Sequence, residues 1–401
     1  MNFMISCLCG ASRQEVVSDR PHLLPSDAEM DRHASGVLFI SHLAINPPEH
    51  RILSGLSYHE SEGAKRFFCG TCGCHIFQKF IVSPALASLA QSLGDVQPPT
   101  EFFAVTTGVI TESPDKRDDT RFVRAPMDDT CDGGLGPWLP VAEMKGRTQS
   151  PETAAPQRST YSSVPATCGC GNVKLLIQRP RELLGMGDKS EKAVQLPWSP
   201  YPDLMFPYKT TAKDELDNPS DEKWYLRKTG EEPKYMAGTC ACKSCRLITG
   251  YEIQTWAFIP RAAISILISP DSATTGSASN ISGRDTTQDA ESYIPLDFEV
   301  LGNLPAGRNP LRSYESSPGV LREFCHGCGA TVFWHSKVRP DLIDVSVGLL
   351  QAGEGARAES LLEWWRDRCS FAEDAGLGRK GWIKDWAESL IQGLEDGMRI
   401  Q

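Results

Sequence analysis

The cysteines of this chain occur mainly in close pairs and one triplet, a spacing that is typical of zinc ligands. The pairs are Cys7/Cys9, Cys69/Cys72, Cys168/Cys170 and Cys325/Cys328, and the triplet is Cys240, Cys242 and Cys245. Two pairs can surround one zinc ion with four sulfurs, as in structural sites. Three sulfurs leave a coordination position open, as in catalytic sites. We therefore predict both kinds of site.

The pairs form two sets of predicted structural ligands, one in each half of the chain. The first set is Cys7, Cys9, Cys69 and Cys72, and the second is Cys168, Cys170, Cys325 and Cys328. Soft thiolates favour zinc over hard cations. The alternative is that these cysteines are free thiols or form disulfides. Cys74 could compete as a ligand in the first set, whereas Cys131 and Cys369 are isolated.

The triplet Cys240, Cys242 and Cys245 is the predicted catalytic site. Three thiolates leave a zinc ion with a formal charge of about −1, which weakens its Lewis acidity, so a soft fourth ligand such as a substrate thiolate is favoured. Lys243 and Arg246 lie beside these ligands and could attract a carboxylate of the substrate. For Lys243 and Arg246 the alternative is that they are ordinary surface charges. For the triplet the alternatives are a second structural zinc site completed by a remote His, Asp or Glu, or a metal-free redox cluster.

The chain contains an internal repeat that relates the two sets. With an offset of 256 residues, nine positions are identical between residues 58–77 and 314–333. They pair Tyr58, Ser61, Gly63, Arg66, Phe68, Cys69, Cys72, Gly73 and Phe77 with Tyr314, Ser317, Gly319, Arg322, Phe324, Cys325, Cys328, Gly329 and Phe333. We call residues 1–112 the N-terminal copy and residues 164–352 the C-terminal copy.

The N-terminal copy lacks the triplet. The segment Arg246–Gly250 aligns with Arg32–Gly36, which places Ser26, Ala28 and Asp31 at the positions of the three cysteines. This set cannot replace three thiolates. We therefore expect one zinc ion in the N-terminal copy and two in the C-terminal copy, and a scaffold or partner role for the former.

The remaining segments are predicted from composition and periodicity. Residues 113–163 read as a linker, 181–235 and 269–291 as insertions in the C-terminal copy, and 353–401 as a helical extension. The expected helices are Ala358–Arg368 and Trp382–Leu394. Short strands are expected at Val37–Leu43, Phe102–Thr107, Asn172–Gln178, Glu252–Ile259, Ala263–Ile268, Thr331–His335 and Ile343–Val347.

The overall composition excludes several classes of function. A net charge of −10 disfavours nucleic-acid binding. The longest apolar stretch, Ala262–Ile268, is too short to cross a bilayer. The first residues lack the pattern of a signal peptide, so the fourteen cysteines favour metal binding in the reducing cytosol, with nuclear access, over disulfides.

The order of these elements resembles the family of glutathione-dependent formaldehyde-activating enzymes, which also includes centromere protein V. The C-terminal copy matches through the segments CGCGNV, CACKSCRLITG, YESSPGVLREFCHGCG and PDLIDVSVGLL. The N-terminal copy matches only the first and last elements. One departure is Ala241, where the family commonly has histidine.

The resemblance implies a mainly β, Mss4-like zinc-binding fold in two tandem copies, with C-terminal helices. It also implies structural zinc on the outer pairs and catalytic zinc on the triplet. The leading hypothesis is a carbon–sulfur lyase acting on a thiol adduct, with S-hydroxymethylglutathione formed from glutathione and formaldehyde as the reference. The alternatives are a non-catalytic zinc-stabilised binding module and a thiol redox or metal-buffering protein. No nucleic-acid or membrane partner is expected.

Overall fold

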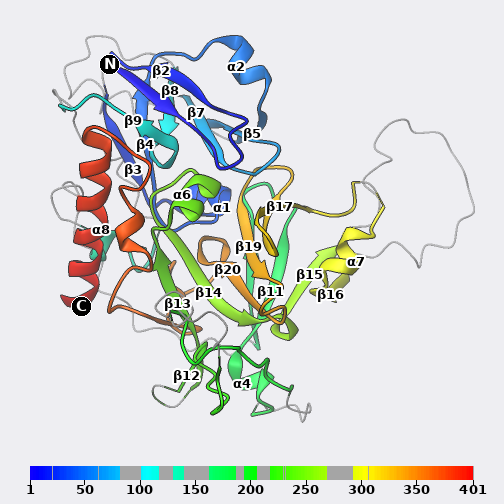
Figure 1. Cartoon of the computed structure of the whole chain (residues 1–401). Helices are drawn as coiled ribbons and strands as arrows, with labels where there is room; N and C mark the ends of the chain where they lie inside the picture. Colours follow the sequence, from blue (N-terminus) through cyan, green and yellow to red (C-terminus); the bar gives the residue numbers. More distant parts are fainter. Residues whose placement is uncertain are drawn as a thin grey trace, which may run out of the picture.

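The computed structural model describes residues 1–19, 21–61, 63–81, 101–116, 130–139, 162–186, 194–205, 217–228, 230, 232–268, 292–305 and 307–400. It is mainly β, with several antiparallel sheets and a long C-terminal helix (Figure 1). The predicted β class and C-terminal helix are confirmed. The predicted insertion 269–291 and most of the predicted linker lie outside the described residues.

The N-terminal copy is built on a six-stranded antiparallel sheet. In spatial order its strands are β3 (Leu23–Ser26), β4 (Ile40–Ile45), β8 (Glu101–Thr106), β7 (His75–Ile81), β6 (Ala64–Phe68) and β5 (Ser57–Ser61). Helix α1 (Glu29–Ser35) joins β3 to β4, and α2 (His50–Ser54) precedes β5.

The main sheet of the C-terminal copy repeats this order and extends it. Its strands are β12 (Leu226–Arg227), β13 (Lys234–Cys240), β14 (Gln254–Pro260), β20 (Leu342–Ser346), β19 (Thr331–Ser336), β18 (Val320–Cys325) and β17 (Leu311–Ser317). Helix α6 (Lys243–Thr249) joins β13 to β14, as α1 joins β3 to β4. The order from β13 to β17 therefore matches that from β3 to β5, in line with the sequence repeat.

The strand register shows which positions of the two sheets are equivalent. His42 lies opposite Thr106, and Trp256 lies opposite Ser346. Further along, Gln78 lies opposite Ala104, as Trp334 lies opposite Asp344. The two sheets can thus be compared residue by residue.

Each copy also has a smaller sheet that carries its first cysteine pair. In the N-terminal copy this sheet contains β2 (Gln14–Val17), β1 (Asn2–Ile5) and β9 (Ile110–Glu112). In the C-terminal copy it contains β10 (Ser163–Thr167), β11 (Lys174–Gln178), β15 (Ile264–Ile268) and β16 (Ser292–Pro295). The short helices α4 (Pro180–Leu183) and α7 (Phe298–Gly302) lie in the segments that follow β11 and β16. The 3₁₀ turns are η1 (Thr107–Val109), η2 (Gly136–Trp138), η5 (Arg261–Ala263), η6 (Val347–Leu349) and η7 (Ala372–Asp374).

The two copies contact each other through matching backbone hydrogen bonds. The Gly108 N–H donates to Gly250 over 2.9 Å, and the equivalent Gly348 N–H donates to Gly36 over 3.2 Å. A second matching pair joins Leu8 to Leu247 and Gly169 to His33. The N-terminal copy therefore supports α6 and the C-terminal copy supports α1, and one hydrophobic core runs through both.

The C-terminal region differs from the sequence prediction. The expected helix at Ala358–Arg368 is wrong: this stretch contains β21 (Leu362–Trp364), which pairs in parallel with β13. Its helical spacing of apolar residues was overridden because β13 offered a free edge for hydrogen bonding. The second helix is present as α8 (Trp382–Ile400), along one side of the molecule (Figure 1).

Helix α8 also packs against parts outside the C-terminal copy. The Trp382 ring meets Phe3 of the N-terminal copy edge-on, with the ring centroids 6.2 Å apart.

The described part of the predicted linker also packs against folded elements. Trp138 is buried and meets the Trp364 ring of β21 edge-on, with the ring centroids 5.3 Å apart. This part of the linker is therefore packed against the domain. Among the described residues, no helix combines the length and apolar character needed to cross a membrane.

Candidate metal centres

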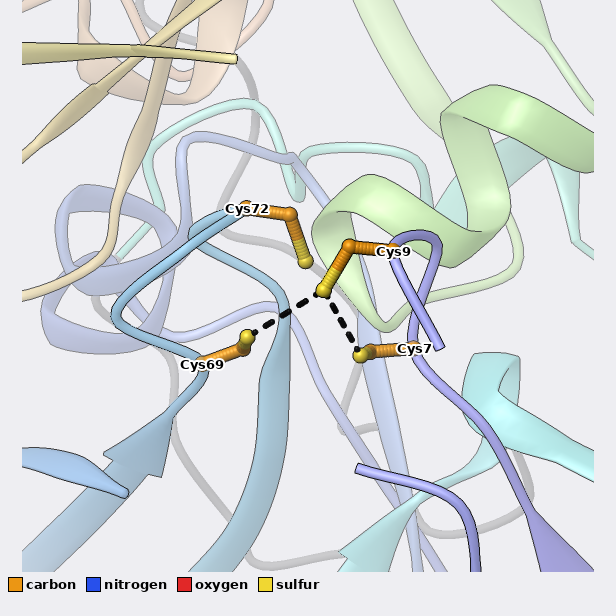
Figure 2. A group of neighbouring side chains, drawn as sticks. All are labelled: Cys7, Cys9, Cys69 and Cys72. Carbon is orange, nitrogen blue, oxygen red and sulfur yellow. Dashed lines mark hydrogen bonds between the residues drawn. The ribbon is translucent and has the colours of Figure 1, made fainter. Parts of the chain in front are cut away.

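The first predicted ligand set comes together in the N-terminal copy. Cys7 and Cys9 follow β1, while Cys69 and Cys72 lie in the turn between β6 and β7. Figure 2 shows the four sulfurs converging, with 3.5 Å between those of Cys7 and Cys9 and 3.6 Å between those of Cys9 and Cys69. All four sulfurs lie within 4.8 Å of one another.

The second set has the same arrangement in the C-terminal copy. The Cys168 sulfur lies 3.5 Å from that of Cys170 and 3.6 Å from that of Cys325, and the Cys170 and Cys325 sulfurs are 3.4 Å apart. Cys328 completes the group. The backbone N–H of Val173 donates to the Cys168 sulfur over 3.3 Å, which stabilises negative charge on it.

These distances fit a tetrahedral metal site. Four sulfurs about 2.3 Å from a central zinc ion would be about 3.8 Å from one another. The observed separations of 3.4–3.6 Å are close to this value. A disulfide would need about 2.05 Å. The structure thus supports sites that could hold metal ions, and the described cysteines are all free thiols.

Two glycines of the cysteine turns are required by the contact between the copies. Gly73 and Gly329 have φ values of 77° and 78°, in the left-handed region. A Cβ atom on Gly73 would lie 2.5 Å from the Phe324 ring, and one on Gly329 would lie 2.6 Å from the Phe68 ring. Any side chain here would be strained and would clash with the other copy.

The triplet is formed at the junction of β13 and α6. Cys240 ends β13, and Cys242 caps α6, where its sulfur accepts a hydrogen bond from the Cys245 N–H over 3.3 Å. The three sulfurs lie within 4.8 Å of one another. Within the described part of the chain, no fourth Cys, His, Asp or Glu joins them.

Arg322 is a partner of the triplet to which the sequence analysis assigned no role. It lies on β18 and is 3% exposed. Its guanidinium donates to the Cys245 sulfur over 3.5 Å, to the Ser244 hydroxyl over 2.9 Å and to the Ser316 hydroxyl over 3.2 Å. The sequence signal that could have identified Arg322 is its alignment with the identical residue Arg66 in the internal repeat.

The surroundings of the triplet favour a thiolate at Cys242 in particular. Hydrogen bonds from the Cys240 and Cys245 thiols lower the pKa of Cys242, and the Arg322 guanidinium acts in the same direction. The hydrogen bond with Cys242 raises the pKa of Cys240. A hydrogen bond from Cys240 lowers the pKa of Cys245, but the hydrogen bond with Cys242 and burial outweigh it and raise that pKa to about 11. Burial alone would lower the pKa of Arg322, but the Cys245 and Cys242 sulfurs raise it. The guanidinium therefore stays charged beside a cluster of sulfurs that favours a bound cation.

The N-terminal copy replaces this site with a closed polar network. Asp31, at the position of Cys245, accepts hydrogen bonds from Arg66 over 2.5 Å and from the Ser26 hydroxyl over 2.6 Å. Arg66 is the equivalent of Arg322. A carboxylate thus takes the place of the thiolate opposite the same arginine, and no open metal position is formed by these residues.

The triplet opens into a cavity of about 370 Å³. All three cysteines line it, together with Arg322 and side chains from β14, β19 and the segment before η7. This volume is within the range of small-molecule sites. Leu204, from the predicted insertion at 181–235, also contributes to the wall.

The predicted substrate contacts are not supported equally. Arg246 is 1% exposed and points away from the cavity, since its guanidinium donates to Gly108 over 2.5 Å and to Leu377 over 3.0 Å. The expectation that it binds a substrate carboxylate is therefore replaced by a structural role between the two copies. Lys243 is exposed beside the triplet, and its role stays a prediction.

The other cysteines do not join the metal groups. The Cys74 thiol is buried and donates to the His75 carbonyl over 3.4 Å, so it does not compete for the first site. Cys131 is exposed, and Cys369 is buried with its thiol directed to the Ser370 carbonyl. Both are isolated, as expected.

The structure thus defines a mainly β protein with three cysteine groups that could hold metal ions. Comparisons of the chain with protein-family models, curated proteins and solved structures found no match. Function is therefore argued from the residues of the site.

Proposed function

We propose that the C-terminal copy is a zinc-dependent carbon–sulfur lyase acting on a thiol adduct. The supporting observation is the triplet Cys240, Cys242 and Cys245, which converges at a cavity without a fourth protein ligand among the described residues. The resemblance to glutathione-dependent formaldehyde-activating enzymes, with their Mss4-like fold, agrees with this assignment. Its reference reaction joins glutathione and formaldehyde to give S-hydroxymethylglutathione.

The donor sets match the proposed metals. Two groups of four thiols and one group of three would hold two structural zinc ions and one catalytic zinc ion. When bound at the triplet, zinc would supply a soft site for the sulfur of the substrate. All three groups lack hard oxygen ligands, so calcium and magnesium are disfavoured.

The protein residues around the triplet would position the reactants. Arg322 offsets the negative charge of the sulfurs, and the Ser244 and Ser316 hydroxyls that it holds lie at the cavity wall. Apolar side chains such as Trp256 and Phe258 form another part of the cavity wall. Holding a thiol and a carbonyl compound together converts a bimolecular addition into an effectively unimolecular step.

The N-terminal copy would act as scaffold in this proposal. Its own triplet position is occupied by the Ser26–Asp31–Arg66 network, and its Gly108 carbonyl binds Arg246 at the back of α6. It thereby supports the helix that carries Cys242 and Cys245. In this role the N-terminal copy would still be a binding module, but its partner would be the C-terminal copy of the same chain.

The proposal is tested by NMR exchange spectroscopy of glutathione, formaldehyde and their adduct. Wild-type protein and a Cys131→Ser control, altered at an exposed cysteine outside the groups, should accelerate exchange. Cys242→Ser should abolish the acceleration and lower the zinc content from about three to about two per chain, measured by mass spectrometry of the metal. No acceleration by the zinc-loaded wild type would refute the proposal.

A further inference from the structure

The cavity at the triplet is walled by aromatic rings. Four of its lining residues are aromatic: Trp256, Phe258, Trp334 and Phe371. Cys240 and Cys245 belong to the same apolar cluster as Trp256 and Phe258, which Trp224 extends by meeting Phe258 at 5.1 Å. The three cysteines and the four aromatic rings therefore line the same cavity.

The N-terminal copy shows that the scaffold does not require these rings. At the positions of Trp256, Phe258 and Trp334 it has His42, Ala44 and Gln78, as the strand registers establish. The equivalent sheet forms with these smaller or polar residues. At these three described positions the tryptophan and phenylalanine rings thus occur in the copy that has the triplet, which associates them with the site and its ligand.

The fourth ring is held at the cavity by an uncommon backbone conformation. Phe371 has a φ of 58°, which is energetically unfavourable for a residue other than glycine. The preceding residue, Ser370, exchanges hydrogen bonds with the triplet strand: its N–H donates to Thr239 and its carbonyl accepts from Ala241, each over 2.9 Å. The strain is retained where it brings a phenyl ring to the triplet cavity.

The charged side chains of the cavity already have partners. Apart from the cysteines, its ionisable residues are Arg322, Arg339, Asp344 and Asp374. Arg339 donates to Asp344 over 2.7 Å and lies over the Trp334 ring at 4.5 Å, while Arg322 bonds to the triplet. Asp374 accepts a hydrogen bond from the backbone N–H of Lys243 over 3.4 Å. Since both arginines already have partners, the interior favours an uncharged substrate group.

From these observations we propose that the substrate of the triplet site carries a planar aromatic group on the carbon bonded to sulfur. It would be the thiol adduct of an aromatic aldehyde, with the ring inside the cavity and the charged part of the thiol compound outside. This inference rests on the proposed carbon–sulfur lyase activity and names its substrate class.

The chemistry balances without an oxidant or reductant. In the forward direction the thiol sulfur bonds to the carbonyl carbon, the π electrons move to oxygen, and that oxygen gains the proton lost by the thiol. In reverse the hydroxyl loses its proton, the O–H electron pair forms the carbonyl π bond, and the carbon–sulfur bond breaks. Its electron pair returns to sulfur, which takes up the proton as the aldehyde is released. The cavity walls would hold the ring through both directions by stacking.

The test compares two stable thioethers by isothermal titration calorimetry with the zinc-loaded full chain. S-benzylglutathione mimics the aromatic adduct, and S-methylglutathione mimics the formaldehyde adduct. The benzyl compound should bind at least about tenfold more tightly, which is the scale of burying one ring among aromatic partners. Trp334→Gln, which introduces the residue found at the equivalent position of the N-terminal copy, should reduce this preference below about threefold.

Two further variants keep the comparison interpretable. Trp198→Gln, at a 55% exposed tryptophan outside this cavity, should retain the full preference. Phe371→Ala should reduce it as Trp334→Gln does. Equal wild-type affinities, or a preference that survives both cavity variants, would overturn the aromatic assignment while leaving lyase activity on the formaldehyde adduct standing. Absence of binding by both compounds together with absence of exchange would overturn both proposals.

Discussion

Arg322 provides the sharpest test of how the triplet is built. Its guanidinium is buried and lies 3.5 Å from the Cys245 sulfur. Replacement by glutamine, Arg322→Gln, removes the positive charge that helps to lower the pKa of Cys242. The thiols would then release their protons less readily, and metal binding, which requires thiolates, would weaken.

The size of the effect follows from the contacts that are lost. A hydrogen bond to a charged group contributes roughly 1.5–3 kcal/mol. Since about 1.4 kcal/mol corresponds to a tenfold change in Kd, the triplet should bind zinc about 10- to 100-fold more weakly in Arg322→Gln. The Arg322 guanidinium donates to Ser316, Cys245 and Ser244, none of which belongs to a four-cysteine group, so both of those groups should keep their affinity.

The assay is zinc transfer to a chromogenic chelator, titrated against the intact chain. One of three zinc equivalents should transfer at lower chelator concentration in Arg322→Gln than in wild type. Arg66→Gln is the matched control, because the equivalent arginine faces the Asp31 carboxylate instead of a thiol. The reasoning fails if Arg322→Gln transfers zinc as wild type does, or if Arg66→Gln releases an equivalent just as early.

Three other predictions concern stability. Burial lowers the pKa of His42 to about 4, so the folded state holds this ring neutral. The contribution of His42 to the free energy of unfolding is therefore fully present above pH 6.5, and it decreases by up to about 3 kcal/mol as the pH drops toward 4. His42→Leu should flatten this acid dependence in urea unfolding. Gly329→Ala should destabilise more than Gly171→Ala, because both residues have positive φ but only Gly329 would also clash with a phenylalanine ring; thermal unfolding measures the difference. Arg379→Met should cost roughly 3–5 kcal/mol by leaving the buried Glu252 carboxylate unpaired, and Glu252→Gln in the same chain should restore part of it.

Each of these has an outcome that would contradict it. An unchanged acid slope in His42→Leu would mean that other groups control acid unfolding, since both proteins share the same cysteine groups. Equal losses in the two glycine variants would remove the argument from the contact between copies. An additive double variant of Arg379 and Glu252 would show that the pair, linked over 2.9 Å, is not energetically coupled.

The cysteine groups could be predicted from the sequence because their geometry is local. Each cysteine pair, such as Cys7/Cys9 or Cys325/Cys328, lies within a single tight turn. The spacing alone therefore directs its two sulfurs to one point. The internal repeat then showed which pairs belong together. The same alignment identified Asp31 as the residue at the position of Cys245, and the structure places it opposite Arg66 accordingly.

Other features depended on contacts between distant segments. The helix expected at Ala358–Arg368 became β21 because β13 supplied hydrogen-bonding partners that periodicity cannot show. Arg246 was expected at the substrate because it adjoins a ligand, but it turns to the N-terminal copy. A side chain's neighbours in sequence do not define its neighbours in space.

The sequence alone determined the three cysteine groups, the repeat and the mainly β class, because covalent spacing and strand patterning are short-range properties. Only the tertiary structure decided what surrounds the triplet. Arg322, Trp334 and Phe371 come from β18, β19 and the C-terminal region, and they meet at one cavity through long-range pairing and packing. The candidate metal ligands could thus be predicted from the sequence, whereas the cavity that would select a substrate for the triplet is formed only in the folded protein.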